Sequence, residues 1–296
     1  MHLLELQQLA ANGIISGSVY ALVALGFTVI YGTVKFFHFA HGAVYAVGAY
    51  LAWLAVVQLW ISVIPGVILA CLLAGVLGVL IDMTVYRPLR ARKSPNLVFL
   101  LASFGVFVFL NNALQLVFGA DIKSLRSGPV QEGHHVFGAV ITNTQIVILI
   151  ACLALALALI IFVKVTRLGK AIRAVADDPV AASLVGIHSE LIILTSFFLG
   201  SVLACAAGIL VSLETNIEPT MGLNAVLKGI IAAVIGGMWS IPGALLGGLI
   251  LGLAENLGIY GISAGWKDAI AFAILVIFLL FRPNGIFGRE SDIRRM

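Results

Sequence analysis

The chain has 296 residues, of which 61% are apolar and 10% charged, and its mean hydropathy is +1.14. Soluble domains are roughly 45–50% apolar and about 25% charged, so this composition excludes an ordinary soluble globule and a disordered chain. The net charge of +4 is typical of cytoplasmic loops in a membrane protein, and we do not expect the chain to bind nucleic acid.

Charged residues leave long uncharged runs, each able to cross the roughly 30 Å of bilayer hydrocarbon as a helix of about 20 residues. A bilayer permits only helices or closed barrels, and barrel strands would alternate over about ten residues. The sequence therefore predicts an all-α, polytopic membrane helical bundle of about 8–9 transmembrane helices. The expected spans are 10–31, 40–58, 62–84, 97–118, 143–164, 190–212, 224–236, 242–258 and 266–281.

Basic residues predict the orientation of these spans, because short loops rich in Lys and Arg stay in the cytoplasm. They gather in the loops after the third and fifth spans and in the tail: Arg87, Arg90, Arg92, Lys93, Lys164, Arg167, Lys170, Arg173, Arg282, Arg289, Arg294 and Arg295. The opposite segments, 119–142 and 213–223, carry Lys123 and Arg126 against Asp121, Glu132, Glu214 and Glu218. We expect the N-terminus outside and the C-terminus in the cytoplasm.

Residue 218 is expected outside and the C-terminus inside, so the chain must cross the membrane an odd number of times between them. A cytoplasmic turn between spans seven and eight satisfies this condition. Glycines and a proline, which lacks a backbone donor, predict this turn at Gly236, Gly237, Trp239, Ser240, Pro242 and Gly243. The preceding helix, 224–236, is then short, with a rise of about 20 Å. Some of the segment from Glu214 to Asn224 must then enter the membrane region without being regular helix, which points to a translocation pathway.

Small and polar residues inside the spans allow two interpretations. Glycines at small-xxx-small spacing, Gly13 with Gly17, Gly243 with Gly247 and Gly248 with Gly252, favour close helix packing over pore lining. Polar side chains either hydrogen-bond a neighbouring helix or line a solute path. These are Asn12, Ser16 and Tyr20 on the first span and Asn111, Asn112 and Gln115 on the fourth.

Lys228 and Glu255 stand on the two arms of the predicted 224–258 hairpin. Counted along the helices, Lys228 lies about 12 Å and Glu255 about 20 Å from the cytoplasmic turn. A long lysine side chain can span this offset of about 8 Å. One interpretation is a buried ion pair that fixes the two helices. The other is that both charges border the route of a zwitterionic solute.

The chain lacks the motifs of several reaction classes. Gly169-Lys170 continues into Ala171, so no phosphate-binding loop is present, and neither His-Glu-x-x-His nor Gly-x-Ser-x-Gly occurs. His38 and His41 have no acidic or cysteine ligand nearby, and the three cysteines lie in apolar runs, so we expect no metal site. We predict that the chain is not an enzyme and binds no cofactor.

The loop at 164–190 is the most distinctive soluble feature of the chain. Asp178 is suited to cap a short helix that Pro179 begins and Gly186 ends, and Ala181, Ala182 and Leu184 would give that helix a small apolar face. Such a helix suits docking into a groove on a partner; the alternative is a merely solvated loop.

At this loop the sequence resembles the inner-membrane permease subunits of bacterial ABC importers for branched-chain amino acids. The resemblance covers essentially the whole chain. It is carried by residues 18–22, Phe39-Ala40-His41-Gly42, Tyr86-Arg87-Pro88-Leu89-Arg90, the 166–187 loop, Gly236-Gly237, residues 240–244 and Arg282-Pro283-Asn284-Gly285-Ile286. Two positions depart from the family pattern: His38, where Asn is usual, and Trp239, where Gly is more usual.

The resemblance implies a fold like that of type II ABC importer permeases, with residues 1–296 as a single transmembrane permease domain. It implies a homologous second permease, two cytoplasmic ATPases that use ATP and Mg²⁺, and a periplasmic binding protein. The ATPases would dock on the 164–190 coupling loop through Arg173, Asp177, Asp178, Pro179, Ala182 and Gly186. Transport of leucine, isoleucine and valine across the bacterial inner membrane would proceed by alternating access.

Two alternatives stay open at this point. A permease of the same family for urea, short amides or other amino acids has nearly the same sequence features. A stand-alone secondary carrier would need buried carboxylates, for which Glu255 is the strong candidate.

Overall fold

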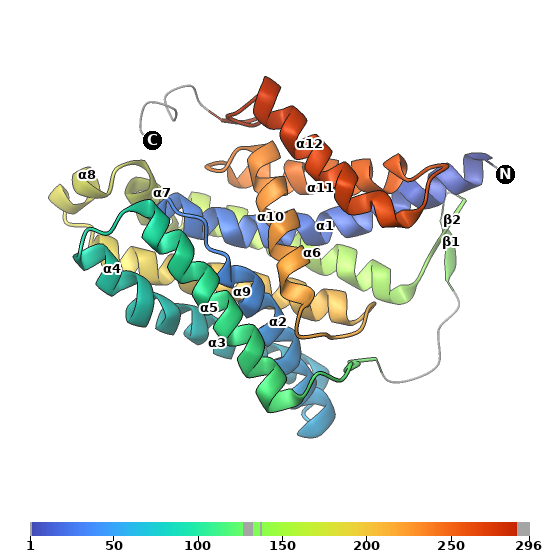
Figure 1. Cartoon of the computed structure of the whole chain (residues 1–296), viewed down its shortest axis with the longest axis horizontal. Helices are drawn as coiled ribbons and strands as arrows, with labels where there is room; N and C mark the ends of the chain where they lie inside the picture. Colours follow the sequence, from blue (N-terminus) through green and yellow to red (C-terminus); the bar gives the residue numbers. More distant parts are fainter. Residues whose placement is uncertain (1, 127–132, 137, 289–296) are drawn as a thin grey trace. The chain divides into compact units, whose positions relative to one another are not determined.

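The computed structural model describes residues 2–126, 133–136 and 138–288 and is largely helical (Figure 1). The predicted basic residues Arg289, Arg294 and Arg295 and the acidic residue Glu132 lie outside the described residues. The α-helices are α1 (His2–Val34), α2 (Ala40–Trp53), α3 (Val63–Ile81), α4 (Arg87–Ala91), α5 (Asn96–Phe118), α6 (Asn143–Val165), α7 (Arg167–Asp177), α8 (Pro179–Leu184), α9 (Ser189–Ser212), α10 (Met221–Gly236), α11 (Ile241–Gly258) and α12 (Lys267–Phe281). Other elements are the π-helical turns η1 (Leu54–Gln58) and η2 (Asp82–Tyr86), the 3₁₀ turn η3 (Ala264–Trp266), and strands β1 (His134–Val136) and β2 (Ala139–Ile141).

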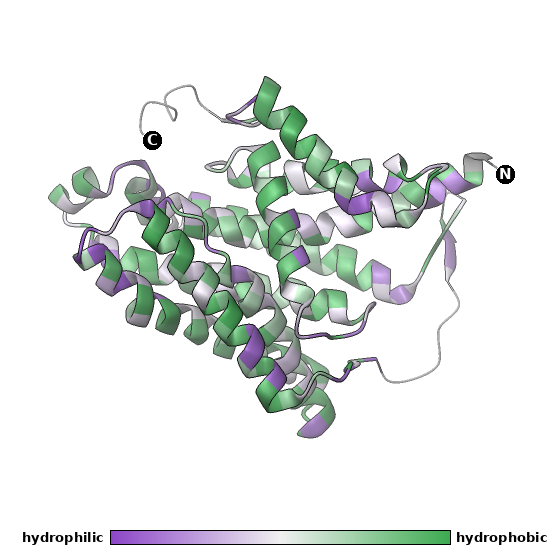
Figure 2. Cartoon of the chain, in the orientation of Figure 1, coloured by the Kyte–Doolittle hydropathy of each residue, from purple (hydrophilic) through white to green (hydrophobic). Residues whose placement is uncertain are grey.

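Eight helical segments of the described chain are long and apolar enough to cross a membrane. They are Leu4–Val34, Ala40–Gln58, Val63–Ala91, Asn96–Phe118, Asn143–Val165, Ser189–Ser212, Ile241–Gly258 and Ala264–Phe281. The apolar helix α10 is shorter. Figure 2 shows apolar residues along the helices and hydrophilic residues mostly at helix ends and in connecting segments. The predicted class, a polytopic bundle of membrane helices, is confirmed.

The predicted start of the short helix at residue 224 is wrong by one turn. Helix α10 begins at Met221, so its 16 residues rise about 24 Å, still less than the roughly 30 Å of hydrocarbon. The earlier start brings Gly222 against Gly42 of α2, where an added Cβ would collide with the Gly42 carbonyl oxygen. Tertiary packing thus extends the helix through a glycine that has poor helix propensity.

Residues 213–220, which lead into α10, are not helical, as predicted. Their backbone is paired with the segment that follows α5. The amide of Lys123 donates to the Ile217 carbonyl at 3.0 Å, and the amide of Ile217 donates to the Lys123 carbonyl at 2.8 Å. The Arg126 guanidinium donates to the Glu214 carbonyl at 2.7 Å. Neighbouring protein groups therefore satisfy this irregular stretch.

The chain divides into two compact units. Unit 1 comprises Met1–Leu25, Ser127–Ala156 and Leu227–Met296, and unit 2 comprises Gly26–Arg126 and Leu157–Val226. Both units depend on glycines for close helix packing.

In unit 1 the small-residue faces bring helix backbones together, which confirms the predicted packing role of these glycines. A Cβ on Gly17 of α1 would lie 2.9 Å from the Gly248 carbonyl oxygen of α11, and a Cβ on Gly248 would collide with the backbone of Ala21. On the other side of α11, a Cβ on Gly247 would collide with the Ala232 carbonyl oxygen of α10. Helix α11 thus lies directly against both α1 and α10.

In unit 2 the helix α9 packs against both α2 and α3. A Cβ on Gly48 of α2 would lie 2.6 Å from the Cα of Cys205, and a Cβ on Gly75 of α3 would lie 2.5 Å from the Phe198 ring. Large aromatic side chains, including Phe197 of α9 and Tyr50 of α2, are fully buried. This unit therefore has a dense helical core.

Candidate functional site

The turn between α10 and α11 lies where the sequence predicted it. Gly237 has a φ of +104°, which favours glycine, and a Cβ on Gly236 would collide with Gly243. The Ser240 hydroxyl accepts a hydrogen bond from the Gly243 amide at 3.1 Å and so caps α11, and Pro242 lies in the first turn of that helix. Trp239 is half-buried beside this turn.

The tail motif Arg282-Pro283-Asn284-Gly285-Ile286 closes the same end of the hairpin. The amide of Ile286 donates to the Ile235 carbonyl at 2.9 Å, and the amide of Phe287 donates to the Gly236 carbonyl at 3.0 Å. These carbonyls belong to the last turn of α10 and have no partner within that helix. Gly285, with a φ of +73°, lies so close to Gly237 that a Cβ would be 2.5 Å from its nitrogen.

A cluster of polar groups joins three helices of unit 1. Lys228 Nζ of α10 lies 3.0 Å from Glu255 Oε2 of α11, so the structure contains the ion pair suggested by their heights. The Tyr20 hydroxyl of α1 donates to the same Glu255 oxygen at 3.0 Å and accepts a hydrogen bond from Lys228 at 3.2 Å. Glu255 is fully buried, and among the described residues its second oxygen, Oε1, has no hydrogen-bond partner.

The start of α12 extends this cluster in a way that the sequence did not indicate. Asp268 Oδ1 lies 3.1 Å from Lys228 Nζ, and the Lys267 ammonium donates to Asn256 Oδ1 at 2.9 Å. Both residues were expected only at the end of a span. The ammonium of Lys228 therefore has three oxygen partners, all within unit 1.

The remaining polar residues of the predicted path belong to both units and are described within each unit. Asn12 accepts a hydrogen bond from Gln8 at 3.2 Å, and Ser16 is half-buried on the same helix. In unit 2, Asn111 is buried, whereas Asn112 is exposed and its side-chain amide donates to the Val108 carbonyl at 2.7 Å. Of the predicted stripe on α1, Tyr20 is the residue that the described contacts join to the charged cluster.

The 164–190 loop folds into α7 and α8, as predicted. Asp178 Oδ1 accepts hydrogen bonds from the amides of Val180 and Ala181 at 2.8 and 3.0 Å and so caps α8, which Pro179 begins. Gly186 has a φ of +86° just after this helix. Arg173 and Asp177 are exposed on α7.

The predicted apolar face of α8 is wrong at one position. Ala182 is buried in a small core with Ile172, Val175 and Ile192, so α8 packs on α7 and α9 through this residue. The exposed large apolar side chains of α8 and the turn after it are Val180, Leu184 and Val185, and Ala181 of the predicted face is exposed as well. A six-residue helix has too few positions for the sequence to indicate which face turns inward.

His38, between α1 and α2, and His41, in the first turn of α2, pack in an aromatic cluster. His38 is fully buried, its Nδ1 lies 2.9 Å from the Tyr86 hydroxyl, and its ring meets that of Phe197 edge-on. Burial, with a smaller effect of the neighbouring His41, lowers the pKa of His38 well below its ordinary value. The described residues contain no group of three or more His, Cys, Asp or Glu able to hold a metal.

Comparison with known proteins decides the family. The sequence model described as "Branched-chain amino acid transport system / permease component" matches residues 9–279. This chain belongs to that permease family. The permease is 40% identical over 293 residues to the high-affinity branched-chain amino acid transport system permease protein LivH of Escherichia coli strain K12, which covers 95% of this chain and 94% of that protein. It is 39% identical to BraD of Pseudomonas aeruginosa over 97% of this chain and 96% of BraD.

A more distant relative also matches nearly the whole length of this chain. The probable branched-chain amino acid transport permease protein LivH of Methanocaldococcus jannaschii is 28% identical and covers 94% of this permease and 91% of itself. The permease family accounts for the membrane helices, and its members are transport subunits rather than enzymes.

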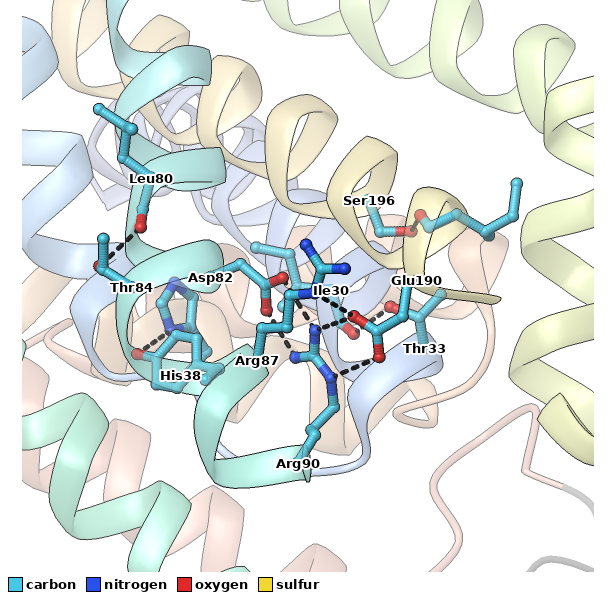
Figure 3. A network of polar contacts seen from close by, with 12 residues as sticks. Ile30, Thr33, His38, Leu80, Asp82, Thr84, Arg87, Arg90, Glu190 and Ser196 are labelled. Carbon is cyan, nitrogen blue, oxygen red and sulfur yellow. Dashed lines mark hydrogen bonds and ion pairs between the residues drawn. The ribbon is translucent and has the colours of Figure 1, made fainter. Parts of the chain in front are cut away.

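A second charged network of the permease was missed by sequence reasoning (Figure 3). Arg90 of α4 donates to both carboxylate oxygens of Asp82, at 2.6 and 2.9 Å, and to both oxygens of Glu190, at 3.2 and 2.9 Å. Arg87 Nε lies 3.6 Å from Glu190 Oε2. The sequence analysis used Arg90 as a cytoplasmic marker and as part of the Tyr86–Arg90 family motif, without a partner. Asp82, a charge just after an uncharged run, was the available signal for a buried partner.

Proposed function

We propose that this chain is the permease subunit of an ATP-driven importer, and that with a homologous permease it forms a path for branched-chain amino acids. The observation that carries this proposal is the 40% identity to LivH of Escherichia coli over nearly the whole of both chains. The chain would act as a single transmembrane permease domain, with residues 164–190 as its coupling loop. The solutes would be leucine, isoleucine and valine.

The proposal requires partners that hydrolyse ATP, because the sequence has no phosphate-binding loop. Two cytoplasmic ATPases would use ATP and Mg²⁺ and dock at α7 and α8, on Arg173, Asp177, Asp178, Pro179 and the turn at Gly186. The exposed apolar side chains of Val180, Leu184 and Val185 support such docking, since this loop otherwise exposes them to solvent. A periplasmic binding protein would deliver the solute.

The multi-pass chain would lie in the bacterial inner membrane with its N-terminus outside and its C-terminus in the cytoplasm. The basic residues of α4 and α7 support this orientation. The turn at residues 236–243, with Trp239, would then face the cytoplasm.

We propose that Lys228 and Glu255 chiefly hold α10 against α11. The complete burial of Glu255 and its hydrogen bond from Tyr20 support this role. The alternative, that Asn12, Ser16, Tyr20, Lys228 and Glu255 in unit 1 and Asn111 and Asn112 in unit 2 border the solute path, stays a prediction. The free acceptor capacity of Glu255 Oε1 among the described residues favours including Glu255 in that set.

Uptake of labelled leucine into proteoliposomes tests the proposal. The complex would contain this chain, its second permease, both ATPases and the binding protein, as identified from neighbouring genes. We expect uptake that needs ATP and every partner, and that unlabelled isoleucine and valine suppress. Uptake by this chain alone would instead indicate a secondary carrier, and uptake of urea or a short amide without leucine would indicate the related solutes.

A further inference from the structure

Arg90 joins two helices of unit 2 at the same end as the α7–α8 loop. Its guanidinium presents one edge to Asp82, in the π-helical turn that continues α3, and the other edge to Glu190, in the first turn of α9. Figure 3 shows the two carboxylates on either side of the guanidinium. Paired, charge-assisted hydrogen bonds of this kind fix orientation as well as distance.

The burial of the network shows that it is not a loose surface ion pair. The side chain of Asp82 is 0% exposed and that of Arg90 is 18% exposed, whereas Glu190 is 45% exposed. A buried carboxylate without its partner is strongly destabilising, so Asp82 holds Arg90 in place. Arg90 is thereby oriented toward Glu190 on the neighbouring helix.

Glu190 in turn belongs to the segment that carries the coupling loop. The neighbouring Ser189 hydroxyl donates to the Pro179 carbonyl of α8 at 3.1 Å. Two residues further along, Ile192 packs in the same core as Ala182 of α8 and Val175 of α7. The start of α9 is therefore fixed to α7 and α8 on one side and, through Glu190, to Arg90 on the other.

We propose that Arg90 is a positioning residue that makes the α7–α8 loop, the start of α9 and the base of α3 move as one body during ATP-driven transport. This inference rests on the proposed function, because it assigns the displacement to ATPases docked at α7 and α8. Helix α9 also packs on α3 further along, where Gly75 meets Phe198, so the link concerns the first turns of α9. Without it, we expect a displacement of the loop to bend these first turns relative to the end of α3. With it, the displacement reaches α3 directly.

Glu190 is the residue to change, since Glu190→Ala breaks the link and leaves the buried Asp82–Arg90 pair intact. Glu190→Gln, of the same size, is the milder variant. Arg92→Gln is the matched control, because it removes a charge from the same loop at an exposed position. Arg90→Lys separates positioning from charge compensation, since lysine keeps the charge but lacks the two-edged fork.

Two spin labels measure the link without reference to the solute. They replace the exposed Lys170 on α7 and the exposed Leu80 on α3, in a chain whose three cysteines have been substituted. In the complete complex, we expect the same label-to-label distance without nucleotide and with ATP and vanadate. In the Glu190→Ala complex we expect the distance to shift or a second population to appear, and the Arg92→Gln complex to match the parent.

Transport gives the second readout. We expect the amount of leucine imported per ATP hydrolysed to fall by about fivefold or more in Glu190→Ala and Arg90→Lys, the lower end of typical coupling effects, with a smaller loss in Glu190→Gln. ATPase co-purification and the melting temperature of Glu190→Ala should stay near the parent values. The inference would be overturned if the label-to-label distances in Glu190→Ala matched those of the parent. It would also be overturned if leucine uptake fell only in proportion to the amount of ATPase bound. If the parent complex imports no leucine, the proposed solute is wrong, while the distances still decide the role of Arg90.

Discussion

Lys228 Nζ and Glu255 Oε2 lie 3.0 Å apart, so two adjacent helices are joined by an ion pair whose carboxylate is fully buried. Removing one partner of a buried pair leaves the other charge uncompensated. We therefore expect Lys228→Met to lower the free energy of unfolding by about 3–5 kcal/mol. Thermal unfolding in detergent, together with leucine uptake, measures the effect.

The double variant Lys228→Met with Glu255→Gln tests the cause of that loss. Because the neutral amide no longer needs a countercharge, we expect the double variant to be more stable than Lys228→Met alone. Asp268→Asn serves as a control for the exposed partner of Lys228, with a small effect. Strictly additive losses in the double variant would contradict a direct interaction.

Gly248 sits where α1 and α11 are in backbone contact. We expect Gly248→Leu to force the helices apart and to destabilise the permease by about 1–3 kcal/mol or to prevent its accumulation in the membrane, because the site has no space for a side chain. Gly105→Leu on α5 is the matched control, since nothing lies within 4 Å of its Cβ position. Equal melting temperatures for the two variants would contradict the close packing.

Substitutions at Gly186 test whether the positive φ at the end of α8 matters for transport. The φ of Gly186 is +86°, but an added Cβ would meet no atom within 4 Å, so a substitution acts through backbone strain rather than collision. We expect Gly186→Val to reduce leucine uptake more than ATP hydrolysis, and Gly186→Asn, which adopts positive φ more readily, to retain more coupling. Uptake per ATP hydrolysed, compared between the two variants, is the measurement. The same value for both and the parent would exclude a role for this turn.

The burial of His38 leads us to expect that the stability of the fold depends on pH. The pKa of His38 is lowered in the fold by burial, so the unfolded chain binds more protons than the folded chain below about pH 6.5. The stability contributed by neutral His38 is present above that pH and is lost as the pH falls. We expect the melting temperature to drop between about pH 7.5 and 5.5, and to drop less in His38→Asn. His135→Asn, at an exposed position, should retain the parent dependence.

The α10–α11 hairpin and the short helices of the 164–190 loop were predictable because their signals are local. Pro242, with Gly236, Gly237 and Gly243 around it, indicates a turn from the local sequence alone. In the same way, Asp178 before Pro179 indicates a capped helix. The Lys228–Glu255 pair was suggested from helix rise alone, since the predicted turn fixed the heights of both residues. The start of α10 was misplaced because Met221 and Gly222 join the helix through packing against α2.

The Arg90 network could not be predicted in the same way. Arg90 and Glu190 are 100 residues apart in sequence, and no periodicity relates them. Asp82 and Arg90 are closer, but they lie about two helical turns apart with a π-helical turn between them, so helical spacing alone does not predict a direct contact. Asp268 was missed for a related reason, since its contact with Lys228 depends on how α12 returns along α11.

The cap that Ile286 and Phe287 place on α10 has a consequence for biosynthesis. These residues follow α12, so ribosomes must synthesise two further membrane helices before the last turn of α10 is complete. Because synthesis adds about 5–20 residues per second, the last hydrogen bonds of the hairpin form several seconds after α10 is synthesised. Until then, the Ile235 and Gly236 carbonyls lack the hydrogen-bond donors that they have in the folded chain.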